Sequence, residues 1–127
     1  MNYFWMAAAV LLVLVGLVHS LLGERRIFAP HRAAGRVVPY AAGHRLGVQW
    51  VSWHLTALLG WVMAAALWER GSAGLPLSAA DQHLGLELTL ALLAGAAGLA
   101  GATAGRHLGW LGLAAAALLT LAGVTLG

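Results

Sequence analysis

The chain has 127 residues, of which 61% are hydrophobic and only 9% are charged, and its mean hydropathy is +0.85. Soluble domains carry charge on about a quarter of their residues, so this composition excludes an ordinary soluble domain and predicts a membrane protein. The chain has no cysteine, which excludes disulfides, thiolate metal sites and thiol nucleophiles. The net charge is +3, but the sequence shows neither a basic helix face nor an aromatic platform, so we predict no nucleic-acid binding.

Four apolar runs follow one another along the chain, at residues 3–22, 46–68, 84–104 and 108–126. Each is close to the ~20 residues that a helix needs to cross ~30 Å of hydrocarbon. Backbone polar groups must be paired within a segment that lies in lipid, so we expect the four runs to be helices. The sequence therefore predicts a single integral membrane domain with an all-α fold, an antiparallel four-helix transmembrane bundle.

The segment between the first two runs, residues 23–45, is rich in arginine and contains Pro30 and Pro39, which we expect to interrupt helix. Its arginines are Arg25, Arg26, Arg32, Arg36 and Arg45. Cytoplasmic loops are enriched in arginine, so we expect this loop inside and both termini outside the cytoplasm, in a bacterial inner membrane. The five arginines are expected to contact anionic lipid headgroups, or else to dock a partner.

Two histidines lie within the first two runs, His19 and His54. Ionisable groups inside a membrane span are costly and are candidates for function. Two imidazoles from neighbouring helices can be the axial ligands of a b-type haem, or half of a transition-metal site that Glu24 or His107 completes. In the alternative structural role, the two imidazoles bond to a backbone carbonyl or to Ser20, Ser52 or Thr56, while Glu24 pairs with Arg25 or Arg45.

The residues around these histidines form two short motifs, H-S-x-x-G-E-R at residues 19–25 and W-H-x-T at residues 53–56. This pattern resembles a family of small bacterial four-helix integral membrane proteins that has no established activity. The resemblance covers the first half of the chain. It implies that His19, Glu24 and His54 form one constellation on the inner side of the membrane, and it implies no catalytic residue.

His83, just before the third run, and Glu87, near its start, stand one turn apart on one helix face. Small residues continue along that side at four-residue spacing, so we expect this face to point toward neighbouring helices. These residues are Ala94, Gly98, Gly101, Ala102 and Gly105. A carboxylate at this depth is a candidate for proton coupling, so a proton-linked small-molecule transporter centred on Glu87 is one functional alternative.

Motifs of hydrolases, zinc proteases and nucleotide-binding proteins are missing from the sequence, so it identifies no catalytic residue. The leading hypothesis is a small inner-membrane protein whose His19 and His54 bind haem or a transition metal. A second hypothesis is a non-catalytic accessory or assembly subunit, which uses its glycine-rich faces and its arginine-rich loop to bind a larger membrane complex. The partners expected besides the lipid bilayer are another membrane protein or further copies of the same chain.

Overall fold

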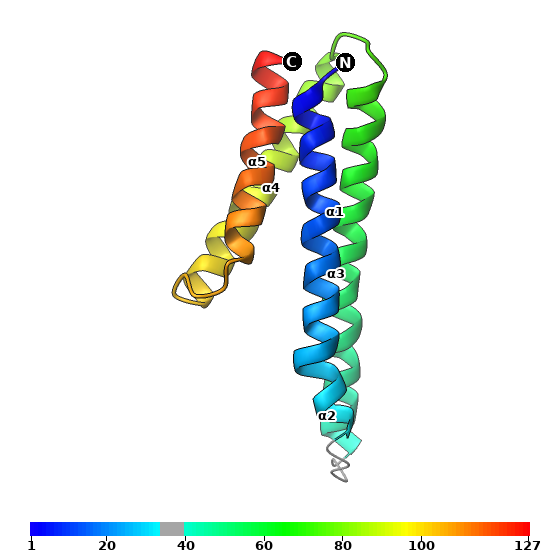
Figure 1. Ribbon diagram of the computed structural model, residues 1–127, viewed down its shortest axis with the longest axis vertical. Coiled ribbons are helices and arrows are strands. Elements are labelled where there is room, and N and C mark those ends of the chain that lie inside the picture. Colours follow the sequence, from blue (N-terminus) through cyan, green and yellow to red (C-terminus); the bar gives the residue numbers. More distant parts are fainter. Residues whose placement is uncertain (34–39) are drawn as a thin grey trace.

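The computed structural model describes the backbone of residues 1–33 and 40–127, and the side chains of residues 1–33 and 44–127 (Figure 1). The described residues form α1 (Tyr3–Gly23), a π-helix η1 (Glu24–Phe28), α2 (Ala29–Ala33), α3 (Tyr40–Ser72), α4 (Ala79–Ala102) and α5 (Gly109–Leu126). Four helical stretches are long and apolar enough to cross a membrane: Tyr3–Ala33, His44–Ser72, Ala79–Ala102 and Gly109–Leu126. The prediction of an all-α protein with four such helices is confirmed.

The segment predicted as a loop is mostly helical where the structure describes it. Helical structure continues from α1 through η1 and α2 to Ala33, and α3 begins at Tyr40. Pro30 lies in α2, so the expected interruption there is wrong, while Pro39 lies outside the described residues. The last π-type bond runs from the Ala29 N–H to the Glu24 carbonyl, so the wide turn ends just before proline, which has no N–H to donate.

The helices pack most closely at the end of the molecule where both termini lie (Figure 1). There α1 packs against α3 and α5, and α5 packs against α4. The core residues are Trp5, Ala8, Ala9, Leu12, Ala64, Leu67, Leu92, Ala116 and Ala117. Toward the turn between α4 and α5, this hairpin diverges from α1 and α3 (Figure 1). The C-terminal end of α1 and the N-terminal end of α3 therefore extend beyond the α4–α5 turn as a pair.

Asn2 connects three helices at the end where the chain begins. Its side chain caps α1 by accepting a hydrogen bond from the Trp5 N–H at 3.1 Å. Its backbone N–H donates to the Gly71 carbonyl at 2.8 Å, and its Nδ2 donates to the Gly123 carbonyl at 2.7 Å. The beginning of α1 is thus bonded both to the last turn of α3 and to the last turn of α5.

The face of α4 that packs inside the protein is not the one expected from its small residues. The buried residues of α4 are Gly85, Thr89, Leu92 and Ala96, whereas Ala94, Gly98, Gly101 and Ala102 are exposed. Gly105 lies beyond the end of α4 with φ +73°, a left-handed conformation that favours glycine in the turn to α5. The neighbouring helices expected on the Ala94–Gly98 side are not supplied by the described part of this chain.

A capping box begins α4 and predicts a measurable contribution to stability. The Ser78 hydroxyl accepts the Asp81 N–H at 3.2 Å, and the Asp81 carboxylate accepts the Ser78 N–H at 3.0 Å. Ser78→Ala is therefore expected to lower the free energy of unfolding by about 1 kcal/mol. Reversible unfolding in mixed micelles, followed by circular dichroism, measures this change. The control Ser72→Ala, outside the box, is expected to have a smaller effect, and equal losses would contradict the assignment.

Candidate functional site

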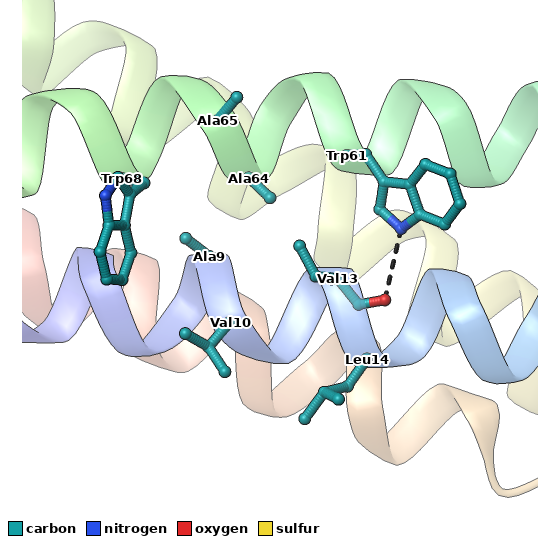
Figure 2. A pocket seen from close by; sticks show the side chains of 8 residues that line it. All are labelled: Ala9, Val10, Val13, Leu14, Trp61, Ala64, Ala65 and Trp68. Carbon is teal, nitrogen blue, oxygen red and sulfur yellow. Dashed lines mark hydrogen bonds between the residues drawn. The ribbon is translucent and has the colours of Figure 1, made fainter.

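The candidate site lies where the last turns of α1 and the π-helix η1 face the first half of α3. Gly16 and Gly23 let the two helices approach closely, because the indoles of Trp61 and Trp53 occupy the space that a Cβ at these glycines would need. The side of α1 with Gly16 and Gly23 therefore points into the protein. The Trp61 indole N–H also donates a hydrogen bond from α3 to the Val13 carbonyl of α1, at 3.3 Å (Figure 2).

His19 is stacked on Trp53, and the two rings hold the end of α1 against α3. Their centroids are 4.2 Å apart and their planes differ by 7°. The Trp53 Nε1–H donates to the His19 carbonyl at 3.0 Å, so the same indole also fixes the backbone of this turn. Phe28, only 1% exposed, meets the edge of Trp53 at 5.9 Å and closes the site from the side of η1. Aromatic side chains thus cover His19 on its α3 side.

His54 lies between a hydroxyl and a carboxylate of the opposite helix. Its Nδ1 is 3.2 Å from the Ser20 Oγ, and its Nε2 is 3.9 Å from the Glu24 Oε2. The Trp50 indole lies against the imidazole with a centroid distance of 4.7 Å. Ser20 and Glu24 are four residues apart, so they share one side of the helix and reach His54 together. This agrees with the alternative in which His54 bonds to Ser20.

The Glu24 carboxylate has partners on two other helices, α3 and α2. The Trp50 Nε1–H donates to its Oε2 at 3.0 Å, and the Arg32 guanidinium of α2 forms an ion pair with its Oε1. The expectation that Glu24 pairs with Arg25 or Arg45 is therefore wrong. Arg32 is eight residues further along the chain, and only the continuous helical path through η1 and α2 brings it back over Glu24. Residues 23–45 were expected to form a loop, and a loop does not place Arg32 beside Glu24, so the sequence did not predict this contact.

Two buried imidazole nitrogens remain without a hydrogen-bond partner in the described part of the chain, His19 Nε2 and His54 Nε2. Buried polar atoms are nearly always bonded, so each orphaned atom needs an explanation. A neutral imidazole nitrogen with a free lone pair is also a ligand atom for transition metals. Both atoms belong to the α1–α3 pair, so this pair is the part of the described structure best suited to take a ligand.

The expected ligands do not all come together. The residues that the structure describes contain no group of three or more His, Cys, Asp or Glu side chains that could hold a metal ion. His54 and Glu24 are close, whereas His107 is exposed in the turn before α5, where its Nδ1 accepts the Gly109 N–H at 3.2 Å. The site as described therefore offers one close imidazole–carboxylate pair, with His19 as a separate imidazole stacked on Trp53.

Two cavities lie along the α1–α3 pair. One of about 400 Å³ lies between α1 and α3 near the termini and is lined only by apolar side chains (Figure 2). A second, of about 450 Å³, is lined by residues from His44 to Ser52. Neither is lined by His19 or His54.

The other predicted site residues lie apart from this cluster. His83 and Glu87 are exposed on α4, on the side opposite its buried face. Arg25 and Arg26 are exposed in η1 and Arg45 is exposed near the start of α3, while Arg36 lies outside the described residues. Phe28 is a site residue that the sequence did not reveal, and Arg32, expected only at lipid headgroups, instead pairs with Glu24. The sequence signal that could have identified Phe28 is that it is an aromatic residue shortly after the H-S-x-x-G-E-R motif.

Comparisons with protein-family models, with curated protein sequences and with solved structures find no match to this chain.

Proposed function

We propose that this chain is a multi-pass protein of a bacterial inner membrane, an antiparallel bundle with both termini outside the cytoplasm. The contacts between helices support the antiparallel arrangement, because Gly71 near the end of α3 meets Asn2, while Trp53 earlier in α3 meets Gly23. The concentration of arginine near the inner ends of α1 and α3 supports the orientation. In this orientation the exposed Arg25, Arg26 and Arg45 contact anionic headgroups.

This arrangement puts the His54–Glu24 pair at the inner boundary of the membrane. The 21 residues of α1 span roughly 30 Å, the thickness of the hydrocarbon core, so Glu24 follows directly after the membrane-spanning part. His54 lies opposite Ser20 and Glu24 on α3 and is therefore at nearly the same depth. The site can then be reached from the cytoplasm, while Trp53 and Phe28 shield it from lipid.

In this position the α1–α3 pair binds a transition metal ion, and the protein serves in metal handling. The observation that carries this function is the pair of unpartnered imidazole nitrogens, of which His54 Nε2 is 3.9 Å from the Glu24 carboxylate. Imidazole and carboxylate together suit divalent ions such as zinc, nickel or copper. A pair of protein ligands leaves coordination positions open, as expected of an exchangeable ion more than of a structural one.

The residues around the pair have defined parts in this function. Ser20 holds the Nδ1 side of His54, which orients the other ring nitrogen toward Glu24. Trp50 donates to the Glu24 carboxylate and positions it, and Arg32 balances its charge when no ion is bound. His19, one turn deeper in the membrane, stays stacked on Trp53 and is not one of the two ligands.

Elemental analysis of the purified protein in detergent, together with its absorption spectrum, tests this function. We expect one of these metals in stoichiometric amount, with a large loss in His54→Ala and in Glu24→Gln. His107→Ala is the matched control and is expected to retain the metal, because His107 lies outside the cluster. A folded protein without stoichiometric metal would overturn the proposal. A Soret band in the absorption spectrum would show that the bound group is haem and not a metal ion alone.

A further inference from the structure

The side of α4 that faces away from the rest of the chain forms a continuous exposed surface, the outward α4 face. Its residues are His83, Glu87, Leu90, Ala94, Gly98 and Gly101. The spacing of three and four residues places them along one side of the helix, opposite the buried Gly85, Thr89, Leu92 and Ala96. This face begins with ionisable side chains at the end near the termini and continues with small residues toward the α4–α5 turn.

The glycines of the outward α4 face have no role in the packing of the chain itself. A Cβ added at Gly98 or Gly101 would meet nothing within 4 Å. At Gly85, on the buried face of the same helix, a Cβ would overlap Val124 and approach Trp5 to 2.8 Å. Glycine weakens a helix relative to alanine, so the exposed glycines need a reason that the fold of one chain does not supply.

His83 and Glu87 give an independent reason to expect a partner on this face. Both are exposed on a helix of membrane-spanning length, and within the described chain neither has a hydrogen bond or ion pair from its side chain. Ionisable side chains in a span are costly against lipid and generally face protein or water. Acid and base stand one turn apart, so the face carries both halves of an ion pair.

We propose that the outward α4 face binds the same face of a second copy of this chain, with the two α4 helices parallel about a two-fold axis along the membrane normal. A two-fold interface is self-complementary, so His83 of each copy meets Glu87 of the other, and both pairs form together. The small residues from Ala94 to Gly101 let the two backbones approach closely, which drives association in lipid. A different protein would need its own acid and base in matching order.

Disulfide cross-linking tests this interface cleanly, because the natural chain has no cysteine. Ala94→Cys places a thiol at the centre of the face. Leu93→Cys is the matched control, since Leu93 is exposed at nearly the same depth but points about 100° away around the helix. In native membranes under mild oxidation, we expect a dimer of the chain for Ala94→Cys and little for Leu93→Cys. Equal yields, or a product containing another protein, would overturn the proposal.

A second substitution tests the close approach without disturbing the monomer. Gly98→Leu adds a side chain where the chain leaves open space, so the monomer should fold normally. We expect its dimerisation in lipid nanodiscs to weaken by about tenfold or more. Ala115→Leu, on an exposed position of α5, is the control and should leave dimerisation unchanged. Unaltered association of a folded Gly98→Leu protein would also overturn the two-fold interface, whether or not the chain binds metal.

Discussion

Replacing Trp5 by alanine is expected to lower the free energy of unfolding by about 3–5 kcal/mol, the range for large-to-small changes at fully buried aromatic residues. Trp5 is 0% exposed and its Nε1–H donates to the Thr120 carbonyl at 3.0 Å. Its indole also fills the space beside Gly85 and Gly123, so one side chain of α1 contacts both α4 and α5. Without it, a cavity opens where the α4–α5 hairpin meets α1, and we expect the hairpin to separate first.

Unfolding in mixed micelles, followed by circular dichroism, measures the effect of Trp5→Ala. Trp68→Ala is the matched control, because Trp68 lies at the same end of the molecule but is 47% exposed. A substitution at such a surface position is expected to change stability by about 0.5 kcal/mol or less. Similar losses for the two variants would show that Trp5 does not hold the hairpin in place.

Gly23→Ala is expected to disrupt the candidate site and to destabilise the protein by about 1–3 kcal/mol, as overpacking of a close contact does. A Cβ at Gly23 would overlap the Trp53 indole, which would then have to move away from His19. The hydrogen bond from Trp53 to the His19 carbonyl would be lost with it. If the α1–α3 pair binds a metal ion, the same substitution should lower the metal content.

Gly60→Ala is the matched control for Gly23→Ala, since both replace a helical glycine by the same residue. A Cβ at Gly60 meets nothing within 4 Å, so alanine is expected to be neutral or to stabilise the helix by up to about 1 kcal/mol. Opposite signs for the two variants, measured by unfolding and by tryptophan fluorescence, support the close approach of α1 and α3. A neutral Gly23→Ala would contradict it.

Several features of the candidate site follow directly from local spacing. Ser20 and Glu24 reach His54 together because they are four residues apart. His19 shares its side of α1 with Gly16 and Gly23, which are three and four residues away. Joint ligation of a haem by His19 and His54 would require the two imidazoles to face each other. In the structure the neighbouring Ser20 faces His54, because Trp53 takes the space beside Gly23 and stacks on His19. A shift of one residue around the helix decides which side chain meets the imidazole.

The sequence by itself determined that four helices form, because the length and apolar composition of each run decide whether it can cross a bilayer. Only the tertiary structure decided which side of each helix lies inside the protein. In water, a helix reveals its buried side through alternation of apolar and polar residues. In lipid both sides are apolar, so chemically identical residues such as Ala94 and Ala96 can be exposed and buried on one helix. That choice depends on how the side chains of neighbouring helices fit, as Trp5 does beside Gly85.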